Sequence, residues 1–279
     1  MIPVLLQIVT PLVPLPFDGS EEGGGDHGWP PSVDSFNSRP LFDTPGLEWL
    51  NNHLVQAVIG AALVIVFWLW MAHNQKVVPT KKQAVGEALY NLLRNGIARD
   101  ILGHEYRRYL PYLVALFSFI LVNNLFGEFF LFMFPTFSKI GYAYGLALCT
   151  FVLYNAAGMI KHGPLRYLRN MTIPHGVPWA LWPVIIPLEF ISNFIARPVT
   201  LALRLFANLF AGHLVIMVFV VGGGMLLTSG VLFYGIAGGV SILFSFAIFA
   251  LELLVGALQA YIFTVLTAQY VSSAIADEH

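Results

Sequence analysis

Long apolar stretches separated by short polar ones run along most of the chain. A helical run of about 18 residues or more is long enough to cross the hydrocarbon core of a bilayer, which is roughly 30 Å thick. The stretches lie at about residues 54–72, 111–134, 141–160, 198–228 and 231–275. The pattern predicts an all-α polytopic membrane protein with about five crossings, in a membrane domain over residues 54–279.

The last two stretches are longer than a crossing requires. A helix over residues 198–228 would extend for about 46 Å, so it must tilt strongly or bend. Only Ser229 and Gly230 separate it from the final stretch. This spacing predicts a long, tilted helix hairpin near the C-terminus.

Two further segments differ from a simple span. Residues 81–108 repeat apolar side chains at helical spacing and carry charged side chains on the other side, which predicts an amphipathic helix lying on the membrane surface. Residues 177–196 are apolar but contain Pro183 and Pro187. Because proline interrupts helical hydrogen bonding, this segment is predicted to enter the membrane as a bent or re-entrant piece.

Residues 1–53 are acidic and rich in turn-forming residues. They hold seven of the 15 acidic residues and only one basic residue, Arg39. The stretch EEGGGDHGWPP at residues 21–31 opposes regular structure. We predict an irregular tail on the extracytoplasmic side.

The amino-acid composition excludes several classes of function. Charged residues make up 10% of the chain and hydrophobic residues 57%, against about 25% charged in soluble domains. The net charge of −1 gives no basic field for a nucleic acid. Cys149 is the single cysteine, and no Gly-rich phosphate loop occurs. The sequence thus predicts no cofactor, no metal site, no nucleic-acid partner and no hydrolysis by this chain itself.

The basic residues predict the orientation in the membrane. Seven of the 14 Lys and Arg residues lie between the first two spans and three follow the third span, whereas Arg39 and Lys139 lie on the other side. Cytoplasmic loops carry the excess of Lys and Arg. The N-terminus is therefore predicted outside and the C-terminus in the cytoplasm.

Arg204 is the most unusual charge, because it lies about two turns inside an apolar helix. An arginine at mid-bilayer costs at least about 2.5–3.5 kcal/mol on insertion scales. A buried structural ion pair is one explanation, and a functional charge that faces a partner acid or water is the other. Thr200, Asn208 and Ala211 lie on the same stripe of the helix.

A second set of polar side chains is predicted toward the outer side of the membrane. Glu252 and Gln259 are seven residues apart and share one helix face. In an antiparallel hairpin, His213 is level with Glu252 and Arg204 is level with Gln259. A His213–Glu252 pair, direct or through a water, can relay protons near neutral pH, although a purely structural pair is the alternative.

The remaining polar residues of the spans divide into two groups. Glu189 lies in the proline-containing segment on the predicted cytoplasmic side and is a candidate transport residue. Glu128, Asn123, Asn124 and Asn155 are interpreted as contacts between helices.

Four segments carry a specific resemblance. They are RPVTLALRLFANLFAGH at 197–213, FALELLVGALQAYIFTVLTAQY at 249–270, VNNLFGE at 122–128 and PLEFISN at 187–193. The chain resembles, from about residue 54 onward, the subunit a family of bacterial F-type ATP synthases. The resemblance implies a multi-pass protein of the bacterial plasma membrane that lies beside a rotating ring of c subunits, with b-type peripheral stalk subunits and the other synthase subunits as partners.

The resemblance also implies a mechanism and a role for each candidate. Protons would enter one half-channel, bind a carboxylate on the c ring, and leave by a second half-channel. Arg204 matches the arginine that faces the ring carboxylate and separates the half-channels. Asn208, His213, Glu252 and Gln259 match the outer half-channel and the support of the arginine, and Glu189 matches the inner one.

Three alternatives remain open. A free-standing secondary transporter would need a complete acid–base pathway in one chain, whereas Arg204 has no evident acid at its own depth. A membrane scaffold without transport does not explain Arg204, His213 and Glu252 together. A Na⁺-coupled form of the same subunit is the third, because the coupling ion is selected mainly on the c subunit.

Overall fold

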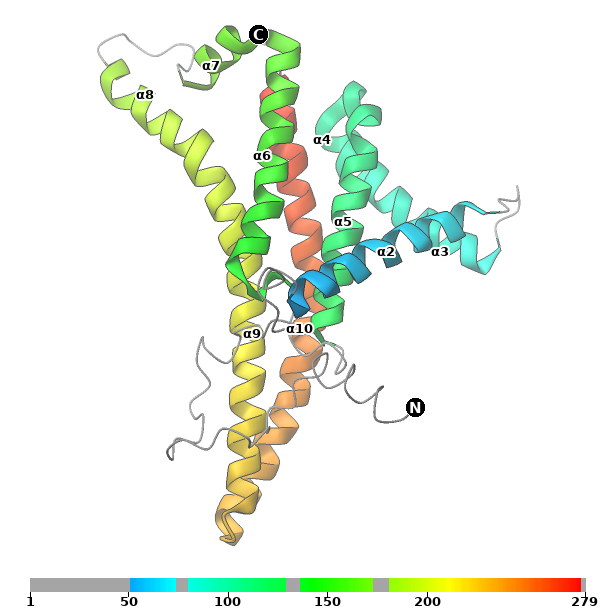
Figure 1. Cartoon of the computed structure of the whole chain (residues 1–279), viewed down its shortest axis with the longest axis vertical. Coiled ribbons are helices and arrows are strands. Elements are labelled where there is room, and N and C mark those ends of the chain that lie inside the picture. Colours follow the sequence, from blue (N-terminus) through cyan, green and yellow to red (C-terminus); the bar gives the residue numbers. More distant parts are fainter. Residues whose placement is uncertain (1–50, 74–79, 129–135, 173–180, 277–279) are drawn as a thin grey trace, which may run out of the picture. The chain divides into compact units, whose positions relative to one another are not determined.

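The chain is helical throughout the part that the structure describes (Figure 1). The computed structural model describes residues 51–73, 80–128, 136–172 and 181–276, so the predicted N-terminal tail lies almost entirely outside the described residues. No strand occurs within these four ranges. Five helices are long and apolar enough to cross a membrane. The predicted all-α polytopic membrane fold is confirmed.

The α-helices follow one another along the chain with short π and 3₁₀ turns between some of them (Figure 1). Their bounds are α2 Asn52–Ala72, α3 Lys81–Leu93, α4 Asp100–Leu102, α5 Tyr106–Glu128, α6 Ile140–His162, α7 Pro164–Thr172, α8 Trp182–Phe190, α9 Arg197–Thr228 and α10 Leu232–Ile275. The π turns are Arg94–Arg99 and Ile191–Ala196, and the 3₁₀ turns are Gly103–Glu105 and Thr136–Ser138.

The chain divides into two compact units. Unit 1 contains residues 1–63, 120–139 and 206–259, and unit 2 contains residues 64–119, 140–205 and 260–279. Helices α2, α5, α9 and α10 each contribute residues to both units.

Unit 1 contains most of a hairpin of α9 and α10 that turns at Gly230 (Figure 1). Gly230 has a φ of 74°, a conformation that glycine adopts without strain. A Cβ at Gly238 would lie 2.6 Å from the carbonyl oxygen of Gly223, so the two helices touch backbone to backbone. The Ser241 hydroxyl donates to the Phe219 carbonyl over 2.8 Å and closes the contact. Small residues permit this close approach.

Unit 2 joins segments that are distant in sequence. The Lys161 ammonium lies 3.2 Å from the Glu105 carboxylate and donates to the Ile275 carbonyl over 2.7 Å. In α7 the Tyr167 ring covers Gly158, where a Cβ would overlap the ring. The Tyr167 hydroxyl donates to Asn155 Oδ1 over 3.0 Å, and burial raises the pKa of this hydroxyl.

Two segments can be compared with their predicted form. The proline-containing segment is continuous with the following helix from Trp182 to Thr228, so the re-entrant alternative is wrong and the bent alternative stays a prediction. Pro183 lies in the first turn of α8, where no helical N–H is needed, and Pro187 lies inside α8, four residues before the π turn Ile191–Ala196. The predicted amphipathic helix is interrupted at Gly103, whose φ is 57°.

Candidate functional site

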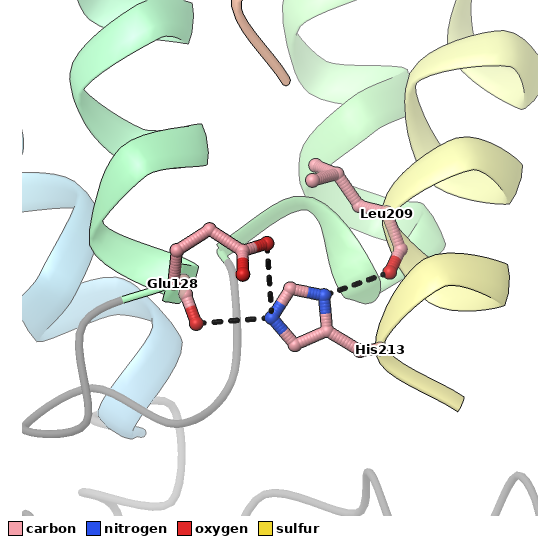
Figure 2. A network of polar contacts seen from close by, with 4 residues as sticks. Glu128, Leu209 and His213 are labelled. Carbon is pink, nitrogen blue, oxygen red and sulfur yellow. Dashed lines mark hydrogen bonds and ion pairs between the residues drawn. The ribbon is translucent and has the colours of Figure 1, made fainter. Parts of the chain in front are cut away.

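Three ionisable side chains of unit 1 meet where α5 ends. Glu128 from α5, His213 from α9 and Glu252 from α10 each offer one ligand atom, and these atoms lie within 4.8 Å of one another. The shortest ion-pair distance, 3.6 Å, joins His213 Nε2 to Glu128 Oε1 (Figure 2). We call Glu128, His213 and Glu252 the acid–histidine cluster.

The His213 ring is held by two backbone carbonyls. Nδ1 lies 3.1 Å from the Leu209 carbonyl oxygen, and Nε2 lies 2.9 Å from the Gly127 carbonyl oxygen (Figure 2). A carbonyl oxygen only accepts hydrogen bonds, so the neutral ring satisfies one of them and the protonated ring satisfies both. The Glu128 carboxylate beside Nε2 provides a counter-charge for the protonated ring. The acceptors around the ring therefore match both N–H groups of its protonated form.

Glu252 lies against the backbone of the neighbouring helix. It is 7% exposed, and its Oε2 has no hydrogen-bond partner among the described residues. A Cβ on Gly212 would overlap the Glu252 carboxylate. Because Gly212, the residue before His213, has no side chain, the Glu252 carboxylate fits against the backbone of α9.

Asparagine side chains from α5 connect this helix to its neighbours in unit 1. Asn124 Nδ2 donates to the Gly256 carbonyl over 2.9 Å, one turn beyond Glu252 on α10. Asn123 Oδ1 accepts from the Thr136 hydroxyl over 3.0 Å. These bonds are the helix–helix contacts that the sequence suggested for both asparagines. Glu128 also makes a contact between helices, since its carboxylate on α5 lies 3.6 Å from His213 Nε2 on α9.

Arg204 is exposed on α9. No hydrogen bond or ion pair joins its guanidinium to any residue that the structure describes. Arg197, at the start of the same helix, has its guanidinium 5.2 Å from the centre of the Tyr270 ring. The flanking Leu201 and Leu205 are buried at 2% and 0% exposure. Arg204 therefore lies on the exposed face of the helix, together with Leu203, which is 40% exposed.

Asn208 and Gln259 each leave an amide nitrogen buried without a partner among the described residues, Nδ2 and Nε2 respectively. Gln259 is 5% exposed. A buried donor without an acceptor is uncommon and is satisfied by water or by a group from another molecule. The predicted proximity of Arg204 to Gln259 stays a prediction.

Glu189 belongs to a separate network in unit 2. Asn193 Nδ2 donates to Glu189 Oε2 over 3.1 Å and to the Met171 carbonyl over 2.8 Å. The Tyr154 hydroxyl donates to the Asn193 carbonyl over 3.0 Å. Asn193 lies in the π turn Ile191–Ala196, and such turns occur frequently at functional sites.

Comparison with known families decides the identity. Residues 54–272 match the family model described as ATP synthase A chain. The chain belongs to this family. It is 43% identical to the ATP synthase subunit a of a Nocardioides species, over 97% of this chain and 94% of the relative. The subunits a of Pseudarthrobacter chlorophenolicus and Paenarthrobacter aurescens are 40% and 38% identical, each over 90% of this chain and 94% of the relative.

Membership of the ATP synthase A chain family confirms the resemblance found in the sequence. It implies a proton-translocating role in the membrane sector of the F-type ATP synthase, an assembly of several different polypeptides. The matched range begins inside α2 and ends inside α10, so it contains every residue of the candidate functional site.

Sequence reasoning missed two residues in the region of the acid–histidine cluster. Glu128 is the last residue of α5, and the predicted topology places this end of α5 on the outer side of the membrane. The position on the outer side could have identified Glu128 as a neighbour of His213. Gly212 is the small residue directly before His213, and its role follows only from the contact with Glu252.

Proposed function

We propose that this chain is the non-catalytic stator subunit that conducts protons to and from the c ring through two offset half-channels. The acid–histidine cluster, with Asn208 and Gln259, forms the outer half-channel. Glu189, held by Asn193, forms part of the inner one. Arg204 is the barrier between them. The peripheral stalk and the other synthase subunits hold the chain in place against the ring.

The proposal rests mainly on the exposure of Arg204 and on its lack of a partner among the described residues. A guanidinium keeps its proton at any accessible pH, so it cannot pass one on. Its exposure on an apolar helix, without a partner in the described residues, suits a carboxylate supplied by another polypeptide. A fixed positive charge there attracts the ring carboxylate in its ionised form and prevents protons from crossing directly between the half-channels.

Protons are the favoured coupling ion because the outer half-channel contains an imidazole, which can take up and release a proton near neutral pH, with an acceptor beside each ring nitrogen. The Na⁺-coupled form is the alternative. A Na⁺ gradient that drives ATP synthesis in reconstituted vesicles at constant pH would select it. We also propose the orientation with the N-terminus outside and the C-terminus in the cytoplasm of a bacterial cell.

The test replaces Arg204 in the assembled synthase. Arg204→Lys retains the charge but loses the planar fork that holds a carboxylate with two hydrogen bonds, so ATP synthesis should be lost. Arg204→Ala should lose synthesis and ATP-driven pumping and open a passive proton leak. Proton flux through vesicles under an imposed potential measures the leak.

Arg99→Ala is the matched control, since Arg99 is also exposed but lies in the π turn after α3. It should synthesise ATP like the unchanged protein. Coupled synthesis in Arg204→Ala, without a leak, would contradict the barrier role.

A further inference from the structure

We propose that the acid–histidine cluster is also a binding site for a divalent transition-metal ion of the zinc type, and that an ion bound there blocks the outer half-channel. The binding itself follows from the cluster's geometry alone. The blocking effect rests on the proposed function.

The donor set is the first argument. Imidazole nitrogen and carboxylate oxygen are both zinc ligands in proteins, and zinc sites with three protein ligands leave a fourth position for water. The imidazole favours zinc, copper or nickel over magnesium and calcium, which prefer oxygen ligands throughout. The sequence predicted no metal site because its only cysteine is Cys149 and the three ligands are scattered along the chain.

The distances are the second argument. Zinc lies about 2.0–2.2 Å from such ligands, so two ligand atoms of a tetrahedral site are about 3.3–3.6 Å apart. His213 Nε2 and Glu128 Oε1 are already 3.6 Å apart. The whole set lies within 4.8 Å, so a small rotation of the Glu252 side chain completes the site.

The two carboxylate oxygens lack hydrogen-bond partners in the part of the chain that the structure describes. Glu128 Oε1 and Glu252 Oε2 are buried without hydrogen bonds among the described residues. The Glu128 side chain is 4% exposed and Glu252 is 7% exposed. Buried carboxylates are normally paired or bound to a metal, because an uncompensated buried charge is strongly unfavourable. A doubly charged cation would balance both.

The orientation of His213 completes the argument. Nδ1 faces the Leu209 carbonyl and can donate to it, which leaves Nε2 toward Glu128 (Figure 2). Metal-binding histidines usually donate their second N–H to a carbonyl or carboxylate in this way, which fixes the ring. Nε2 also faces the Gly127 carbonyl, so the space between these acceptors suits a positive species, either a proton or a metal ion.

The binding test uses the purified synthase with Zn²⁺ or Co²⁺ as probes. The unchanged protein should retain one Zn²⁺ per chain in elemental analysis, and Co²⁺ should give the visible absorption of a four- or five-coordinate site. His213→Gln and Glu128→Gln should weaken binding by about 100-fold or more, since even removal of outer-shell partners weakens metal sites by about 10–100-fold. Glu128→Gln retains the side-chain shape, so it keeps the test valid if His213→Gln does not assemble.

His104→Gln is the control, because His104 is exposed at the 3₁₀ turn before α5 and should not affect binding. Equal Zn²⁺ binding by the unchanged protein, His213→Gln and Glu128→Gln would overturn the site.

A flux measurement then separates the two claims. Zn²⁺ should inhibit proton flow in the unchanged synthase when supplied from the outer side, and chelation should restore the flow. If Zn²⁺ binds through the cluster but flow is unaffected, the blocking claim is overturned while the binding claim holds. If His213→Gln and Glu252→Gln also conduct normally, the proposed outer half-channel is itself wrong.

Discussion

Gly212 determines how close the Glu252 carboxylate comes to α9. A methyl group at this position would occupy the space of the carboxylate. Alanine is favoured over glycine in a helix by about 1 kcal/mol, so the substitution should not destabilise α9 itself. We expect Gly212→Ala to assemble and to reduce proton flow by about tenfold or more, because a displacement of about 1 Å at a reacting group has effects of this size.

ATP-driven proton pumping in membrane vesicles measures this effect. Gly224→Ala is the matched control on the same helix, since a Cβ there meets no atom within 4 Å. Its pumping should equal that of the unchanged protein. Normal pumping in Gly212→Ala would show that the position of Glu252 does not limit proton flow.

At the scale of one element, the π turn Ile191–Ala196 directs Asn193 toward Glu189. Asn193→Ala removes the amide that holds Glu189 and leaves the Met171 carbonyl without this donor, at a cost of about 1–3 kcal/mol. We expect the Asn193→Ala synthase to assemble and to conduct protons more slowly than the unchanged protein. Asn193→Gln should also have less than full activity, because its longer side chain shifts the amide.

Ser192→Ala is the control for this element, because Ser192 is exposed in the same turn. The rate of proton flow through vesicles at equal amounts of assembled synthase is the measurement. A rate in Asn193→Ala equal to that in Ser192→Ala would exclude Asn193 as the positioning residue of Glu189.

Some features of the helices could be predicted from the sequence, and others could not. Long apolar runs identified the membrane helices, since only helix length and hydropathy are needed for that step. Helical rise also predicted that His213 and Glu252 are level. The rotation of each helix about its axis depends on side-chain packing, which the sequence does not provide. For that reason the closer contact of His213 with Glu128 was missed.

For the whole molecule, the orientation in the membrane remains a prediction that labelling can test. With Cys149 replaced, a cysteine at Ser229, in the turn between α9 and α10, should react with an impermeant thiol reagent from outside the cell. A cysteine at Gly163, between α6 and α7, should react only after the membrane is opened or inverted. The opposite pattern would reverse the proposed direction of proton flow.

The acid–histidine cluster draws its three members from helices that leave the ribosome one after another. A chain whose synthesis stops before α10 contains Glu128 and His213 but lacks both Glu252 and Gln259. Under the proposed function, such an unfinished chain has no complete outer path. On that proposal, a chain truncated before α10 would not by itself open the outer path for protons.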